Sequence, residues 1–199
     1  GLGCPGPLDI EEGLIHHTPN LDLDDVNIKE ELSDLNTPIH LENDANAAAL
    51  GEQWFGAGKG ADNMIYITVS TGIGGGVIIN GDIYHGTSDG AGEIGHMTLD
   101  PNSVVQCGCG NFGCWEALAS GTALSRLGQD ALKAEEETMI NDLVDEISEV
   151  DGAVVAKAAQ EGDEVAVELM NTLAERLGTG LASLINIFNP SRIVFGGGV

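Results

Sequence analysis

Basic residues are scarce in this chain. Of 199 residues, 7 are Lys or Arg against 32 Asp and Glu, so the formal net charge is −25 with His neutral. Binding to DNA or RNA depends on Lys and Arg that neutralise phosphates, and docking on anionic lipid has the same requirement. The composition therefore argues against a nucleic-acid partner or a membrane surface for this part of the protein.

Aromatic residues and long apolar runs are also lacking. Aromatics make up 4% of the chain and hydrophobic residues 42%, so the core must be mainly aliphatic and packed around the 29 glycines. No run of about 18 apolar residues could span a membrane, and no basic segment followed by an apolar stretch marks a secretion signal. These absences predict a cytoplasmic protein of one large or two small domains.

The first part of the chain predicts a strand followed by a helix. Residues 1–19, with three Pro and four Gly, are expected to form loops or strand ends. The apolar residues 39–41 favour a buried strand, and residues 45–55 are rich in helix formers. Residues 42–44 would then lie on the turn after a strand, where ligands bind in open α/β sheets.

The sequence composition changes after this helix. A strongly β-forming segment, Met64–Val69, leads into a Gly-rich turn at residues 70–76 and two short strands joined by the hairpin pair Asn80-Gly81. The pattern predicts an antiparallel meander that opens a second domain. We therefore expect two α/β domains, residues 1–61 and residues 62–199.

The rest of the chain is expected to be mainly helical. Helices are predicted at residues 116–128, 138–150, 153–161 and 164–188. In the last helix, Gly178 and Gly180 lower the helix propensity and are predicted to permit close backbone packing, and Asn189-Pro190 ends the helix. Because a Gly-rich turn after the apolar residues 193–195 usually leads to another element, we expect a fragment of a longer chain.

Three cysteines cluster at Cys107, Cys109 and Cys114, with His96 eleven residues before the first. Three cysteines and one histidine are a standard tetrahedral ligand set for zinc, and the glycines between them let the backbone turn tightly. The alternative is a group of buried or reactive free thiols. A filled site leaves no open position for water, so the predicted zinc is structural.

Two other motifs are ambiguous from the residues alone. The backbone N–H groups of residues 70–76 could surround a phosphate, but the run lacks the Lys of a Walker loop and fits an empty hairpin equally well. Asp44 is either the N-cap of the helix that follows or a general base at a strand end, beside an amide on Asn43 that could bind hydroxyls.

Three polar residues surround the cysteine cluster in sequence. Glu93 and His96 are three positions apart and could face one pocket, and Glu116 follows the last cysteine by two. A zinc-bound His96 would have a second nitrogen, which could contact a substrate hydroxyl. The alternatives are a structural histidine and two ordinary surface acids.

Taken together, these motifs resemble those of the ROK family of sugar kinases and sugar-responsive repressors. The most specific segment is residues 107–116, which read Cys-x-Cys-Gly-x2-Gly-Cys-x-Glu. The other matching segments keep the family's order and spacing: residues 1–9, 19–21, 42–48, 70–76, 91–96, 186–190 and 196–198. The resemblance thus extends over nearly the whole chain.

The resemblance implies a role for each motif. Asp44 corresponds to the catalytic base that takes the proton from the 6-hydroxyl of the sugar. The implied sugar contacts are Asn43, Asp44, Glu93, His96 and Glu116, and the implied zinc ligands are His96, Cys107, Cys109 and Cys114. ATP with Mg²⁺ would be bound at two Gly-rich turns that include Ser70, Thr71, Gly72, Gly74, Gly75, Gly76, Gly196 and Gly197.

The fold that the resemblance implies is the two-domain α/β fold of actin and hexokinase, which is ribonuclease H-like, and this chain would hold part of it. The implied activity is ATP-dependent phosphorylation of a hexose, glucose to glucose 6-phosphate in glycolysis, by a homodimer or larger homo-oligomer. Because the family's Asp-x-Gly-x-Thr phosphate hairpin is absent, we expect this segment to be inactive alone. The alternatives are the sugar-sensing domain of a repressor, or a kinase for N-acetylglucosamine, N-acetylmannosamine or fructose.

Overall fold

The computed structural model describes residues 1–16, 18 and 23–199, so the matching segment at residues 19–21 lies outside the description. Helices and strands alternate along these residues, which confirms the expected α/β class. Two compact units interleave along the chain: Gly1–Thr68, Gly74–Glu93 and Pro190–Gly196 form the first, and Val69–Ile73, Ile94–Asn189 and Gly197–Val199 form the second. The division into domains between residues 61 and 62 stays a prediction.

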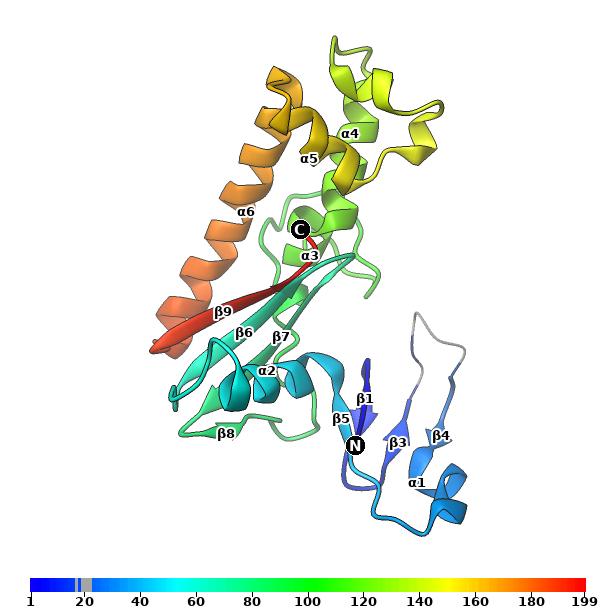
Figure 1. Cartoon of the computed structure of the whole chain (residues 1–199), viewed down its shortest axis with the longest axis vertical. Helices are drawn as coiled ribbons and strands as arrows, with labels where there is room; N and C mark the ends of the chain where they lie inside the picture. The colour runs from blue at the N-terminus through cyan, green and yellow to red at the C-terminus, as the bar shows by residue number, and fades with distance from the viewer. Residues whose placement is uncertain (17, 19–22) are drawn as a thin grey trace. The chain divides into compact units, whose positions relative to one another are not determined.

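In the first unit, strand β1 (Leu2–Cys4) pairs in parallel with β5 (Leu41–Asn43), as Figure 1 shows. The strand predicted at residues 39–41 thus lies two residues later than its apolar run. Pairing with β1 decides the difference, because the register of the two strands begins at Leu41. As a result, helix α2 (Asp44–Phe55) follows β5 without an intervening residue.

A small antiparallel sheet forms another part of the first unit. Its strands lie in the order β2 (Leu8–Asp9), β3 (Leu14–Ile15) and β4 (Val26–Asn27), and β4 is followed by the short helices α1 (Ile28–Glu31) and η1 (Ser33–Leu35). These elements surround a cluster of buried apolar side chains: Cys4, Leu8, Ile15 and Leu41. The first residues therefore form strands as well as loops.

A four-stranded sheet supplies most of the remaining first unit. Its strands lie in the order β8-β7-β6-β9, with bounds β6 (Met64–Val69), β7 (Ile73–Ile79), β8 (Asp82–Ile83) and β9 (Arg192–Gly197). β7 and β8 are antiparallel, and the turn between them has φ of 54° at Asn80 and 91° at Gly81. Both the strand at Met64–Val69 and the Asn-Gly hairpin are confirmed.

Helix α2 packs on this sheet through small residues. The helix and the sheet share one core cluster: Ala49, Met64, Tyr66, Ile78 and Val194. A Cβ at Gly76 would lie 2.5 Å from the Cβ of Ala49, so the glycine in β7 lets the helix approach closely. Residues 70–76, predicted as a turn, are therefore strand from Ile73 onward, and residues 70–72 alone form the turn.

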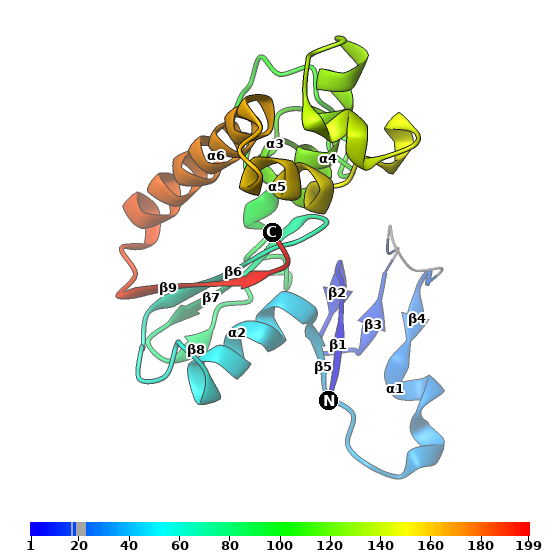
Figure 2. The same ribbon diagram turned by 45° about the horizontal axis from the view of Figure 1, so that its top comes forward.

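The second unit is built from helices, which Figure 2 shows packed together. The helix α6 (Glu164–Phe188) contacts α3 (Trp115–Ala119), α4 (Gly121–Lys133) and α5 (Gly152–Gln160). α6 has the bounds expected from its apolar spacing. The single helix predicted at residues 116–128 is instead two helices, because Ser120 ends α3 and its hydroxyl accepts a hydrogen bond near the start of α4.

The helix predicted at residues 138–150 is wrong. This segment holds two short 3-10 helices, η3 (Met139–Leu143) and η4 (Ile147–Glu149). The N–H groups of Asp145 and Glu146, which a continuous helix would bond to carbonyls four residues earlier, donate to Glu149 instead and divide the segment. Asp163 accepts from the first N–H of η3 at 2.8 Å.

The C-terminal end of α6 follows its sequence signals. The helix ends at Asn189, whose φ of 43° is left-handed, and Pro190 comes next. Despite its 25 residues, α6 is not apolar enough to cross a bilayer, and the same holds for every other helix in the described ranges.

Candidate active site and metal centre

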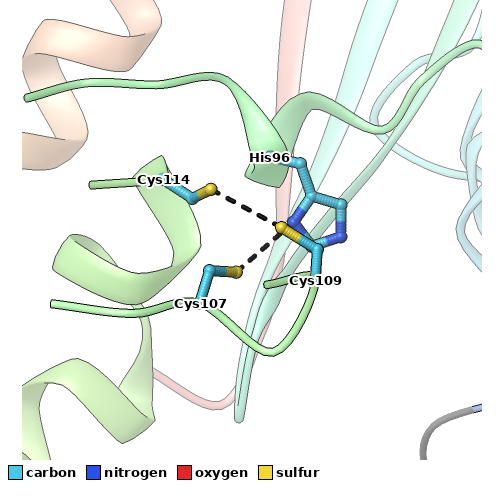
Figure 3. Close-up of side chains that lie close together, drawn as sticks. All are labelled: His96, Cys107, Cys109 and Cys114. Carbon is cyan, nitrogen blue, oxygen red and sulfur yellow. Dashed lines mark hydrogen bonds between the residues drawn. The ribbon is translucent and has the colours of Figure 1, made fainter. Parts of the chain in front are cut away.

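The four side chains predicted to bind zinc lie together in the second unit (Figure 3). One ligand atom from each of His96, Cys107, Cys109 and Cys114 lies within 4.8 Å of the others. The His96 Nδ1 to Cys107 Sγ distance is 3.5 Å, and the Cys109 Sγ to Cys114 Sγ distance is 3.7 Å. Zinc with bonds of about 2.0–2.3 Å to nitrogen and sulfur requires tetrahedral ligand separations of roughly 3.3–3.8 Å. Both separations lie in that range, and the four residues could hold one metal ion.

The loop before α3 brings these sulfur atoms together. Cys107 N donates to Asn111 O at 2.8 Å, and Gly110 N donates to Cys107 O at 2.9 Å, which closes a tight turn. Gly110 has φ of 90° and Gly113 has φ of 68°, where other residues are strained. A Cβ at Gly113 would lie 1.9 Å from the carbonyl oxygen of Asp100, so this position requires glycine.

The protein around the cysteines does not by itself favour thiolates. Burial raises the pKa of the Cys107 thiol to about 12 and also raises the pKa of Cys114. The exposed Cys109 differs, because a hydrogen bond from the backbone of Asn111 lowers the pKa of its thiol. Since metals bind thiolates, the charge of a cation would be needed to ionise the two buried cysteines.

The junction of β5 and α2 places Asn43 and Asp44 at the start of a helix. Asn43 is the N-cap, and its Oδ1 accepts from Ala45 N at 2.9 Å and from Asn46 N at 3.1 Å. Asp44 is the first residue of α2 and is exposed, with one oxygen accepting from Ala45 N at 2.9 Å. The interpretation of Asp44 as the N-cap is therefore wrong, and its carboxylate is accessible to a substrate.

Glu93 lies near Asn43, although they are 50 residues apart in the chain. A Cβ at Gly6 would lie 3.7 Å from Glu93 Oε1 and 3.8 Å from Asn43 Nδ2, so the two polar groups border the same space. The residue before Glu93 is Gly92, with φ of 93°, and a Cβ there would lie 2.9 Å from the carbonyl oxygen of Gly75. Gly92 thus allows the loop that carries Glu93 to approach the backbone of β7 closely.

A supporting group that the sequence analysis missed lies beside Asn43. Glu42 Oε1 accepts from Asn43 N at 2.9 Å and from Asn46 Nδ2 at 3.1 Å, and Glu42 Oε2 lies 2.9 Å from His85 Nε2. These contacts fix the junction that carries Asp44. The one sequence signal for this supporting role is the position of Glu42 at the end of a strand. No local sequence signal indicates that His85 contacts Glu42.

The predicted sugar contacts divide between the units. The first unit holds Asn43, Asp44 and Glu93, and the second holds His96 and Glu116. Glu116 is in the first turn of α3, and its Oε1 lies 3.5 Å from Cys107 Sγ. Glu116 is therefore part of the surroundings of the metal cluster rather than an ordinary surface acid.

A cavity of about 390 Å³ in the second unit lies beside the turn at residues 70–72. Its polar and glycine lining comes from that turn, from the first turns of α4 and α5 and from the residues after β9: Ser70, Thr71, Gly121, Thr122, Ser125, Asp151, Gly152 and Gly198. Gly121 N donates to Ser70 O and Thr122 Oγ1 donates to Thr71 O, both at 2.7 Å. The N-termini of α4 and α5 border this cavity, and helix N-termini favour anionic groups.

The predicted nucleotide-binding residues are only partly at this cavity. Ser70 and Thr71 line it, whereas Gly74, Gly75 and Gly76 are strand residues of β7. The other three predicted residues are Gly72, Gly196 and Gly197. Each packs closely against another part of the protein, because an added Cβ would meet Glu116, Tyr66 and Val69, respectively. The helix starts at Gly121 and Gly152 were missed, although Ser-Gly-Thr and Asp-Gly are recognisable helix-start patterns.

Comparison with known proteins identifies relatives of two kinds. The chain is 40% identical over 200 residues to a glucokinase of Halalkalibacterium halodurans, covering 100% of this chain and 61% of that protein. It is 37% identical over 199 residues to a xylose repressor of Caldicellulosiruptor bescii, covering 98% of this chain and 49% of that protein. The chain therefore spans less than two thirds of these relatives.

A solved structure resembles the whole chain. The crystal structure of a ROK family glucokinase from Streptomyces griseus, in complex with glucose and AMPPNP, matches with a TM-score of 0.88 at 40% identity, covering 100% of this chain and 64% of that one. This likeness confirms the expected actin and hexokinase type of fold, of which the chain covers part. The model of the ROK family matches residues 1–199, and the chain belongs to that family.

Proposed function

We propose that the protein transfers the γ-phosphoryl group of ATP to the 6-hydroxyl of a hexose, and that the hexose is glucose. The observation that carries this proposal is the exposed carboxylate of Asp44 at the start of α2, with Asn43 and Glu93 bordering Gly6 in the same unit. A family member that binds glucose and AMPPNP at 40% identity supports it.

In this mechanism Asp44 accepts the proton of the 6-hydroxyl as the sugar oxygen attacks the γ-phosphorus, and ADP leaves. A positioned base of this kind contributes about 10²–10⁴-fold to the rate. Asn43 and Glu93, in the same unit as Asp44, hold other hydroxyls of the sugar, and the sugar contacts implied at His96 and Glu116 stay predictions. Mg²⁺ bound with ATP would neutralise developing charge on the phosphates.

The nucleotide would occupy the cavity beside the turn at residues 70–72. Backbone N–H groups at residues 71–72 and at the start of α5 would supply donors without a lysine, which suits a chain so poor in basic residues. The first N–H groups of α4 are already bonded to Ser70, Thr71 and Ser120. Gly198, which also lines the cavity, would lie on the adenosine side.

The metal in the Cys₃His cluster is proposed to be zinc with a structural role. The cluster fixes the η2 turn (Ile94–His96) that carries His96 and the start of α3 that carries Glu116. Because both residues are proposed sugar contacts, the metal would position them, and the four protein ligands leave no open coordination site.

The second candidate is a sugar-sensing domain without turnover, which the likeness to a xylose repressor favours. Kinase activity on N-acetylglucosamine, N-acetylmannosamine or fructose is a further alternative for the substrate. A homo-oligomeric state and a cytoplasmic location stay predictions.

The test is ADP release by the full-length protein with MgATP and each sugar, in wild type and in an Asp44→Asn variant. We expect glucose-dependent turnover in wild type and a loss of about 10²–10⁴-fold in kcat in the variant, with glucose binding retained. Asp82→Asn is the matched control, because Asp82 is an exposed acid of β8 in the same unit. Sugar binding without ADP release in wild type would favour the sensing domain, and full turnover in Asp44→Asn would exclude Asp44 as the base.

A further inference from the structure

Two of the chain's three arginines line one cavity of the second unit. The cavity has a volume of about 380 Å³ and is lined by Arg126 of α4 and Arg176 of α6. Because Asp and Glu outnumber Lys and Arg by 32 to 7, composition gives no reason to expect two guanidinium groups together. We call this space the arginine cavity, and it shares no lining residue with the cavity beside the turn at residues 70–72.

Each guanidinium group makes one hydrogen bond to the end of α3. Arg126 Nη2 donates to Ala117 O at 2.8 Å, and Arg176 Nη1 donates to Leu118 O at 3.0 Å. These bonds satisfy carbonyls in the last turn of a helix, which is a structural role. A guanidinium has five N–H donors, however, and neither arginine forms an ion pair with a carboxylate among the described residues.

Two acids, Asp100 and Asp130, also line the cavity and partly offset the two positive charges, but neither forms an ion pair with an arginine among the described residues. Burial, and then the neighbouring charge of Arg176, lower the pKa of Arg126, while Asp130 acts in the opposite sense. Asp130 is 2.9 Å from Lys133, and Asp100, the other acid that lines the cavity, accepts from a nearby backbone N–H. No carboxylate of the described residues bridges the arginines, so a bound anion would relieve their repulsion.

The walls of the cavity indicate what the anion would be attached to. Leu118 and Leu127 supply apolar surface, and Ser103 supplies a hydroxyl. Guanidinium forks match the oxygens of phosphate, and a cavity of this size admits a small organic group besides. We propose that the arginine cavity binds a small phosphorylated metabolite, with its phosphate between Arg126 and Arg176.

The position of the site connects it to the metal centre. Both arginines contact the end of α3, and α3 begins directly after the metal ligand Cys114 and carries Glu116. A phosphate that draws the guanidinium groups away from these carbonyls would alter the last turn of the same helix. The inference does not rest on kinase activity, because the part of the chain that lines the cavity also matches a xylose repressor.

The test is isothermal titration calorimetry on the full-length, metal-bound protein at constant ionic strength. AMPPNP and Mg²⁺ are present throughout, so that the proposed nucleotide cavity is filled. Glycerol 3-phosphate and inorganic phosphate are titrated separately. We expect one site for glycerol 3-phosphate, tighter than for inorganic phosphate, and a loss of affinity of roughly 10- to 100-fold in Arg126→Gln and in Arg176→Gln.

Arg192→Gln is the matched control. Arg192 also donates to backbone carbonyls, those of Ala57 and Lys59, but it belongs to the first unit and lines neither cavity. Its substitution lowers the net charge equally and should leave both affinities unchanged.

Several results would overturn the proposal. Wild-type protein that binds neither probe has no such site, and Gln variants that bind as wild type show that the arginines do not form it. Equal weakening by Arg192→Gln would assign the effect to net charge, and equal affinity for the two probes would exclude a contribution from the organic group. If a Gln variant does not fold, Arg→Lys replaces it, since lysine keeps the charge without the fork and is expected to bind more weakly.

Discussion

The carboxylate of Glu116 accepts a hydrogen bond from the backbone N–H of Ile73 at 3.0 Å. Its other oxygen lies 3.5 Å from Cys107 Sγ, so one side chain links the turn at residues 70–72 to the metal cluster. Gly72 makes room for this contact, because a Cβ there would lie 2.2 Å from Glu116 Oε2. Glu116, which the sequence predicts to be a sugar contact, thus also supports the fold of the second unit.

Glu116→Ala should destabilise the protein by about 1–3 kcal/mol, because it leaves the buried N–H of Ile73 without an acceptor. Glu116→Gln keeps an oxygen at this place and should cost less than Glu116→Ala. Urea denaturation of the metal-bound protein measures both. Equal stability of wild type and Glu116→Ala would show that the Ile73 contact is not formed in solution.

Metal analysis should find one equivalent of zinc per chain, and Cys109→Ser should remove most of it. Cys109 is exposed, so its substitution creates no cavity, and any drop in melting temperature reports loss of the metal. Cys4→Ser is the control for zinc content and not for melting temperature, since Cys4 lies outside the cluster but is buried in the core of the first unit. Full zinc content in Cys109→Ser would remove this residue from the ligand set.

Local sequence signals predicted those parts of the fold that local interactions determine. Helix α6, strand β6 and the Asn80-Gly81 hairpin follow from apolar spacing, β propensity and turn chemistry. The grouping of His96 with the three cysteines was predictable because the cysteine spacing and the glycines set most of it within residues 107–114.

Long-range contacts decided the rest. The start of the short helix η3 within residues 138–150 is capped by Asp163, which is more than twenty positions away. Pairing with β1 shifted β5, and the supporting contact of His85 with Glu42 joins residues 43 positions apart. No pattern within a single segment contains that information.

The two glycines of α6 give a matched pair of opposite effects. Both were predicted to permit close packing, but a Cβ at Gly180 would lie 2.2 Å from the ring of the buried Trp115, whereas a Cβ at the exposed Gly178 would meet nothing within 4 Å. We expect Gly178→Ala to stabilise the protein by about 0.5–1 kcal/mol through helix propensity. Gly180→Ala should destabilise it by about 1–3 kcal/mol through overpacking.

Thermal or urea unfolding of the two alanine variants, compared with wild type, checks this prediction. Equal effects of both substitutions would show that Trp115 does not pack against Gly180.

Asp163 should make stability depend on pH in the acid range. Burial alone would raise its pKa, but hydrogen bonds from Met139 N, Ala166 N and the Thr138 hydroxyl lower the pKa below its ordinary value. Because the pKa of Asp163 is lowered in the folded state, its ionised carboxylate stabilises the fold at pH values above the unfolded-state pKa of about 3.9. This stabilisation is lost as the pH falls through the folded-state pKa. Asp163→Asn should therefore be less stable than wild type at pH 7.

Urea denaturation of both proteins at pH 7 and at successive values below pH 4 measures this difference, which should shrink as pH falls. A stability difference that stays constant with pH would show that the charge of the Asp163 carboxylate does not contribute to stability. Asp82→Asn serves as the control, because Asp82 is exposed and makes no comparable set of bonds in the described residues.

The interleaving of the two units has a consequence for how this protein can change in evolution. The chain passes from one unit to the other five times, at residues 68/69, 73/74, 93/94, 189/190 and 196/197. A single exchange of gene segments cannot then replace one unit and leave the other whole. A glucokinase and a xylose repressor match 100% and 98% of the chain, as expected if both units are inherited as one block.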